Sequence, residues 1–205
     1  MAGKRSNQAV RREPKQLRAR QTVDAVLEAT VRILRREGSD ALTTNRIAEV
    51  AGVSIGSLYQ YFPGKGAIFS ALHRRHIEEI DRMIHAELTR HAASSLETLI
   101  GALVTAMIDA HAGDPELYEL MATQIPHRAD ATEDFAVRLH GAFRMAVGSR
   151  MHKKSQQRDL DKTVFIVTNM VETLSHGAAL RRPAGVSLGE AKEEAVRAIV
   201  AYLNA

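Results

Sequence analysis

The stretch that decides the fold runs from Thr43 to Lys65 and reads TTNRIAEVAGVSIGSLYQYFPGK. Its apolar residues recur at the spacing of two short helices that share one core: Ile47, Ala51, Val53, Leu58 and Tyr61. Two helices that cross at about 90–120° need a small residue at the crossing, which Ala48 supplies, and a turn residue tolerant of positive φ, which Gly52 supplies. The pattern predicts a helix-turn-helix whose second helix is free to enter the major groove of DNA.

The composition favours helices and excludes several kinds of chemistry. The 205 residues are 45% hydrophobic and include no Cys. Disulfides, thiolate nucleophiles and Cys-ligated zinc are therefore excluded, and a reducing compartment is compatible with the chain. The N-terminal MAGKRSNQAVRREP has no apolar stretch behind its basic residues, and the longest apolar region, residues 96–108, is too short to span a bilayer. We therefore expect a cytoplasmic protein without a signal peptide.

Positive charge is concentrated at the N-terminal end of the chain. Residues 1–66 contain 12 Lys and Arg against 6 Asp and Glu, whereas residues 67–205 contain 16 against 18. A basic segment beside a helix-turn-helix is the electrostatic footprint of a DNA-binding head on a neutral or acidic body. The alternative is a basic tail that is merely solvated.

The spacing of apolar residues predicts an all-α chain of about nine helices, without strands or fixed-period repeats. We expect helices from about Pro14 to Gly38, after Thr43, after Ser54, and over residues 65–91, 96–108, 115–123, 130–151, 162–180 and 187–203, with a charged loop over 153–161. The corresponding organisation is a disordered basic arm (1–14), a helix-turn-helix domain (15–66) and a helical ligand-binding and dimerisation domain (67–205).

The motif resembles that of the tetracycline-repressor family of bacterial transcription regulators, over roughly residues 15–75. The resemblance rests on Thr43-Thr44, Ile47-Ala48, Ala51-Gly52-Val53-Ser54, Gly56-Ser57-Leu58-Tyr59, Tyr61-Phe62 and Lys65. It implies an all-helical homodimer in which a three-helix DNA-binding head is joined to a ligand-binding body and the last two helices pair between subunits.

The resemblance also implies which residues contact double-stranded DNA. These are Thr44, Asn45, Arg46, Ser54, Ile55, Gly56, Ser57, Tyr59, Gln60, Tyr61 and Lys65. Thr44 and Lys65 would bind phosphates at helix N-termini. Gln60 is the best base reader, because its amide can bond an adenine edge twice, and Gly56 allows close backbone approach. Arg46 stands where many relatives have an acidic residue, so it either reaches DNA or is simply exposed.

A polar stripe on the expected helix over 162–180 is the first candidate for a small-molecule site. Asn169, Glu172, Thr173 and His176 share one face, opposite an apolar stripe. They would line an effector pocket, where Glu172 favours a cationic or hydrogen-bonding ligand, or lie at a dimer seam or on the surface. Weaker candidates, each more often ordinary core, are Met107, His111, Tyr118, Gln124, His140, Phe143 and Phe165.

Small residues on the last helix suggest how two subunits pair. Ala191, Ala195, Ala198 and Tyr202 lie along one face, which would pack either between subunits or within one chain. Specific DNA binding requires a dimer, because a single short recognition helix buries too little surface against DNA. Two recognition helices roughly 34–36 Å apart can read the two halves of a palindrome.

The sequence gives little support for a catalytic serine or a metal site. Gly52-Val53-Ser54-Ile55-Gly56 matches the nucleophile elbow of hydrolases, but that motif needs a preceding strand. His73 and His76 flank two arginines, which repel a metal ion. We expect no catalytic residue, metal or cofactor, and interpret the chain as a ligand-responsive repressor of a palindromic operator. The alternatives are a ligand-independent nucleoid or adaptor protein, favoured by a tightly packed body, and an all-α enzyme.

Overall fold

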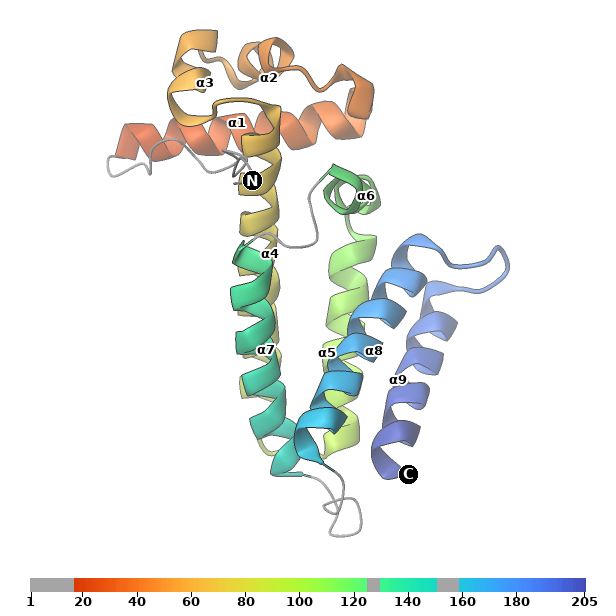
Figure 1. Ribbon diagram of the computed structural model, residues 1–205. Helices are drawn as coiled ribbons and strands as arrows, with labels where there is room; N and C mark the ends of the chain where they lie inside the picture. Colours follow the sequence, from red (N-terminus) through yellow and green to blue (C-terminus); the bar gives the residue numbers. More distant parts are fainter. Residues whose placement is uncertain (1–16, 125–129, 151–158) are drawn as a thin grey trace, which may run out of the picture. The chain divides into compact units, whose positions relative to one another are not determined.

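The computed structural model describes residues 17–124, 130–150 and 159–205, which contain nine α-helices and no strand (Figure 1). The predicted all-α fold class is confirmed. The chain divides into two compact units. The first contains the described residues up to His76 together with helix α6 from Glu116, and the second contains residues 77–115 and the described residues from Asp130 onwards.

The first unit is a small helical domain built on α1 (Leu17–Glu37). Helices α2 (Thr44–Ala51) and α3 (Ile55–Tyr61) lie on the same side of α1 (Figure 1). The beginning of α4 (Lys65–Arg90) and α6 (Pro115–Gln124) complete the unit. Its core is apolar and includes Val26, Ile33, Ile47, Leu58, Phe62 and Ile68. Burying these side chains is the main contribution to the stability of the unit.

Helix α2 is held at both ends. At its N-terminus the Thr43 hydroxyl accepts a hydrogen bond from the backbone amide of Arg46, at 3.2 Å. At its C-terminus Gly52 adopts a left-handed conformation with φ of 69°. The guanidinium of Arg32, on α1, donates to the carbonyl oxygen of Val50 at 3.2 Å. Thr43 and Gly52 thus cap the short helix locally, as the sequence predicted, and Arg32 adds a partner from a different helix.

The second unit is a helical bundle around α8 (Leu160–Leu180). Helices α5 (Leu96–Ala112), α7 (Asp130–Gly148) and α9 (Leu188–Asn204) all pack against α8, and residues 77–90 of α4 complete the unit. The core is again apolar and includes Ile84, Leu99, Ile100, Val104, Ile108, Val147, Val164, Val167 and Ile199.

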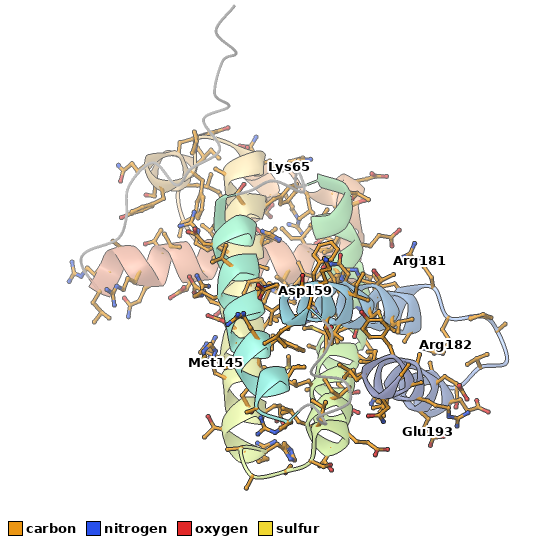
Figure 2. All side chains as sticks on the ribbon, turned by 60° about the horizontal axis from the view of Figure 1, so that its bottom comes forward. Lys65, Met145, Asp159, Arg181, Arg182 and Glu193 are labelled. Atoms are coloured by element: carbon orange, nitrogen blue, oxygen red, sulfur yellow. The ribbon has the colours of Figure 1, made fainter. Side chains whose placement is uncertain are left out.

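Local capping explains where the helices of the second unit begin. The Ser187 hydroxyl accepts from the Glu190 amide, and the Glu190 carboxylate accepts from the Ser187 amide, which is the expected capping box. Asp159 caps α8 by accepting from the amides of Asp161 and Lys162 (Figure 2). The charged loop predicted over 153–161 therefore ends at Asp159, because this cap starts the helix at Leu160; residues 151–158 lie outside the described part of the chain.

The division between the units differs from the boundary predicted after residue 66. Ile68, Phe69 and Leu72, on the first turns of α4, belong to the core of the first unit, as does Leu120 on α6. Helix α4 is continuous through the predicted boundary and contributes residues to both units. A sequence pattern could not indicate this, because helical periodicity does not specify which core buries each turn of a continuous helix. The predicted arm, residues 1–14, lies outside the described residues.

The small-residue face of α9 packs largely within its own chain. Ala195 is buried at 5% exposure, and Ala191 and Tyr202 are packed against the core of the second unit. Only Ala198 of this face is exposed. Of the two interpretations of this face, packing within one chain accounts for the burial of Ala195, and pairing between subunits stays a prediction for the exposed Ala198.

No helix in the described ranges is both long enough and apolar enough to cross a bilayer.

We expect Gly52→Ala to destabilise the protein by roughly 1–2 kcal/mol, because an L-residue is strained at a φ of 69°. Its added Cβ would meet nothing within 4 Å, so the cost is conformational and not steric. Gly56→Ala is the matched control: Gly56 lies in α3, where an added Cβ would meet only Ser54 Oγ at an ordinary contact distance of 3.9 Å, and alanine should stabilise the helix by up to about 1 kcal/mol. Urea unfolding followed by circular dichroism measures both. Equal effects of the two substitutions would contradict the left-handed turn.

Candidate functional site

Helix α3 buries one side and leaves the other open. Leu58 is fully buried in the core of the first unit. Ile55, Gly56, Tyr59 and Gln60 are exposed, with Ile55 and Tyr59 at 38% and 42%. A seven-residue helix anchored in this way offers most of its remaining surface to a partner.

The serines that open α3 cap the helix. The amide of Ser57 donates to Ser54 Oγ at 3.0 Å, and the two hydroxyls share a hydrogen bond of 2.8 Å. Ser54 follows α2 and a turn, not a strand. The hydrolase-like spacing around it is therefore a helix cap, because the strand that would aim a serine nucleophile is replaced by a helix.

A pair of hydroxyls connects the beginning of α2 to α3. Thr44 Oγ1 and Tyr59 Oη share a hydrogen bond of 3.1 Å. Asn45 is exposed next to Thr44, whereas Tyr61 is half-buried against the core of the first unit. The structure therefore brings Thr44, Asn45 and Tyr59 together on the side of the unit that α3 leaves open.

Arg46 is engaged in a small ion network. Its guanidinium donates from Nη2 and Nε to the Glu37 carboxylate, at 2.8 and 3.1 Å, and from Nη1 to Glu49 at 2.9 Å. The hydrogen bond from Arg46 lowers the pKa of Glu37, and the two carboxylates raise the pKa of Arg46. The expectation that Arg46 either reaches DNA or is merely exposed missed this network. The sequence could have indicated part of it, because Glu49 lies three residues after Arg46 on the same helix, a spacing that favours an ion pair.

Lys65 is the first residue of α4, and its side chain is exposed (Figure 2). Its ammonium group lies 5.7 Å from the centroid of the Phe69 ring, a weak cation–π contact. It forms no ion pair with a carboxylate of the described residues. A cation at the first turn of a helix, next to unsatisfied amides, is well placed to bind an anion.

Two imidazoles meet in the interior of the second unit. His111, on α5, is 2% exposed, and its ring centroid lies 4.7 Å from that of His176 on α8. Burial lowers the pKa of His176; the charge of Glu172 opposes the shift and that of Arg181 adds to it. Met107 and Phe143 are buried in the same core. Three of these candidate ligand residues, His111, Met107 and Phe143, are therefore buried, and His176 is half-buried.

The remaining candidates lie elsewhere. Phe165, Asn169, Glu172 and Thr173 are exposed on α8, so three of the four residues of the polar stripe face outward and only His176 is half-buried. His140 is half-buried. Tyr118 belongs to the first unit, where its ring meets that of His76 edge-on at 5.1 Å. The side chain of Gln124 lies outside what the structure describes.

Two interior hydroxyls were missed by the sequence analysis. Ser175 Oγ and Thr168 Oγ1, both on α8, are buried and have no hydrogen-bond partner among the described residues. They are seven residues apart and therefore lie on one side of the helix. The sequence did contain an indication of them, because Thr168 and Ser175 are polar residues on the otherwise apolar face of α8 that includes Val164 and Val171.

The described residues contain no cluster of three or more His, Cys, Asp or Glu that could hold a metal ion. Of the two histidines considered for zinc, His76 packs against Tyr118, and burial lowers the pKa of His73.

Comparison with known proteins identifies related sequences and folds. A family model described as bacterial regulatory proteins, tetR family, matches residues 26–72, and one described as tetracyclin repressor-like, C-terminal domain, matches residues 95–203. The nucleoid occlusion factor SlmA of Haemophilus ducreyi is 38% identical over 72 residues, which cover 35% of this chain and 36% of that protein. The match thus spans about a third of the relative's length.

Two solved structures share the fold. The fatty acid degradation regulator FadR from Bacillus halodurans superposes with a TM-score of 0.68 at 15% identity, covering 92% of this chain and 97% of that one. FadR from Bacillus subtilis, solved in complex with stearoyl-CoA, has a TM-score of 0.65 at 13% identity, covering 87% and 98%. Because the C-terminal family model alone matches more than half of the residues, the chain belongs to the tetR family of bacterial regulatory proteins.

Proposed function

We propose that this protein is a homodimeric, ligand-responsive transcriptional repressor that binds a palindromic operator. The observation that carries the proposal is the open side of α2 and α3, where Tyr59 and Gln60 are exposed and the half-buried Thr44 is hydrogen-bonded to Tyr59. Hydroxyls and a helix N-terminus suit phosphates, and an exposed amide suits a base edge. Asn45, Ile55 and the α4 residue Lys65 extend the proposed contact.

Gly56 supports contact with DNA independently. A Cβ at this position would meet only Ser54 Oγ, at 3.9 Å, so folding does not require glycine here. Glycine inside a helix is less stable than alanine by about 1 kcal/mol. The residue therefore has no structural advantage, and the close approach of a DNA backbone to α3 accounts for its presence.

A homodimer is part of the proposal because α3 has only seven residues. Two copies roughly one helical turn of DNA apart would read two half-sites. Phe165 and Ile166 on α8 are exposed apolar side chains, at 59% and 38%, and Ala198 and Ala201 on α9 are exposed and small. Since α8 and α9 pack against each other, a four-helix bundle between subunits would cover both sets.

The proposed effector binds the second unit and favours a conformation that does not bind DNA. Only a difference in affinity between the two conformations can shift the equilibrium. The interior imidazoles His111 and His176 support a site in this unit, and a protein of the same fold has been solved with stearoyl-CoA.

A second candidate function is ligand-independent binding to the nucleoid, which the similarity to a nucleoid occlusion factor favours. The two candidates differ in one respect that can be measured. Operator binding by a repressor is weakened by a small molecule that binds the second unit, whereas that of a ligand-independent factor is not. We propose no enzymatic activity, because Ser54 is a helix cap.

Gln60 and Lys65 should affect DNA binding differently. After selection of bound duplexes from a random pool, Gln60→Ala should relax base preference at one position per half-site, at a cost of roughly 1–3 kcal/mol. Lys65→Ala should weaken binding to all duplexes and reduce the salt dependence by about one phosphate contact per protomer. Lys162→Ala, an exposed lysine in the first turn of α8, is the control and should change neither. Absence of salt-sensitive binding to any duplex would refute the proposal.

Gly56→Ala should weaken operator binding about tenfold, equivalent to about 1.4 kcal/mol, although it does not destabilise the fold. The added methyl group holds the DNA backbone away from α3. Fluorescence anisotropy with a labelled operator measures the affinity on the same preparation used for unfolding. Unchanged affinity would show that the DNA does not approach this turn of α3.

Phe165→Asp should convert the dimer into monomers at micromolar concentration, because it introduces a charge into the proposed seam. Val137→Asp is the matched control: Val137 is also an exposed apolar side chain, on α7, at 70%, and its replacement should leave a dimer. Sedimentation equilibrium gives the mass of each variant. Dissociation by the Val137 variant alone would place the interface on α7 instead.

A further inference from the structure

The end of α1 and the beginning of α2 are joined by an ion network that we call the Arg46 network: Glu37, Arg46 and Glu49. The Arg46 guanidinium donates to the Glu37 carboxylate from Nη2 and Nε, at 2.8 and 3.1 Å. It also lies 2.9 Å from the carboxylate of Glu49, one turn later on α2. Because Glu37 is the last residue of α1, its contact with Arg46 closes the connection between the two helices over residues 38–43.

Neither charge of the Glu37–Arg46 contact stabilises its own helix. Glu37, in the last turn of α1, lies at the negative end of the dipole of that helix. Arg46, in the first turn of α2, lies at the positive end of the dipole of its helix. Both charges are therefore unfavourable for the helices that contain them, and their contact benefits instead the packing of α2 on the end of α1.

The contact between the helices is also the more restrictive part of the network. A guanidinium that donates two parallel hydrogen bonds to one carboxylate fixes both the distance and the relative orientation of the two groups. The side chains of Arg46 and Glu37 are 38% and 35% exposed, whereas that of Glu49 is 69% exposed. Solvent and salt therefore screen the contact within α2 more than the contact between the helices.

The first turn of α2 also belongs to the open side of the helix-turn-helix. Thr44, two residues before Arg46, shares its hydrogen bond of 3.1 Å with Tyr59 on α3. The hydroxyl of Thr43 accepts a hydrogen bond from the amide of Arg46 itself, at 3.2 Å. An orientation of α2 that is fixed through Glu37 therefore also fixes Thr44 relative to α3.

Arg46 differs in its electrostatic surroundings from Lys65, the lysine at the start of α4. Two carboxylates contact the Arg46 guanidinium, so the three charges of the network sum to −1. A phosphate would have to displace one of these carboxylates in order to reach the guanidinium. Lys65 forms no ion pair with a carboxylate in the part of the chain that the structure describes, so its charge is available to a phosphate.

We propose that Arg46 is a positioning residue, which acts through Glu37 to hold α2 at the orientation that operator binding requires and does not itself contact DNA. The inference rests on the proposed function, because the orientation of α2 matters for binding a duplex. It departs from the expectation that the family resemblance gave for Arg46, which was a direct contact with DNA.

A double-mutant cycle on operator binding, measured by fluorescence anisotropy, tests the proposal. Arg46→Ala and Glu37→Gln should each weaken binding to the selected operator about fivefold, and the double variant should bind no more weakly than either single variant. Removal of a negative charge from the head by itself favours DNA binding, so weakening by Glu37→Gln would come from lost positioning. A direct phosphate contact by Arg46 predicts the opposite: Glu37→Gln would leave binding unchanged or strengthen it, and Arg46→Ala would weaken it in both backgrounds.

Salt dependence separates positioning from phosphate contact. The Glu37–Arg46 pair is present before and after DNA binds, so Arg46→Ala should leave the slope of log affinity against log salt concentration unchanged, whereas Lys65→Ala should reduce it. Arg144→Ala is the matched control, because it breaks an exposed contact with Asp161 between two helices of the second unit and should change neither affinity nor slope. A slope reduced as much by Arg46→Ala as by Lys65→Ala would overturn the proposal.

Hydrogen exchange separates this proposal from the proposed function, because it requires no DNA. Arg46→Ala and Glu37→Gln should each increase the exchange rate of the α2 amides at least about threefold, and Arg144→Ala should not. Unchanged exchange in both variants would refute the positioning role even in a protein that binds DNA, and faster exchange with unchanged operator affinity would show that the contact is only structural. Faster exchange in a protein that binds no duplex would refute the proposed function and leave the attachment of α2 through Arg46 standing.

Discussion

The attachment of α3 through one fully buried residue is the constraint on which the DNA-binding head depends. Leu58 is the only fully buried side chain of this seven-residue helix in the described structure, and Phe62 follows at its end. Because only one residue of α3 is fully buried in the core, the opposite side of the helix stays exposed to solvent. Its position is instead secured at the ends, by the Ser54 cap and by the hydroxyl pair of Thr44 and Tyr59. The same arrangement therefore both anchors α3 and leaves one side of it accessible.

The helices of the second unit differ from α3, because they bury a whole face in a shared core. Most of the inner face of α8 is apolar, and Val164, Val167 and Val171 bury it against neighbouring helices. Ser175 and Thr168 depart from this pattern in a place where apolar residues of similar size would be more stable. Such departures from local consistency are expected at functional sites.

Helices and their ends were predicted well because their determinants are local. Thr43, Ser54 and Ser187 cap the helices that follow them, and Gly52 adopts the left-handed turn expected of it. The start of α8 and the pairing of Arg46 were not predicted. In the first case a cap by Asp159 extends the helix, and in the second a carboxylate nine residues earlier, Glu37, comes within reach only when α1 and α2 pack.

The sequence by itself determined the helix-turn-helix, the all-α class and the family, since periodicity, caps and turn residues act over a few positions. Only the tertiary structure decided which faces are covered. It turned Ala195 inwards, left Asn169, Glu172 and Thr173 exposed, and enclosed Ser175. Helical periodicity specifies which residues share a face, but the burial of that face depends on which helix packs against it, and that contact joins residues far apart in the chain.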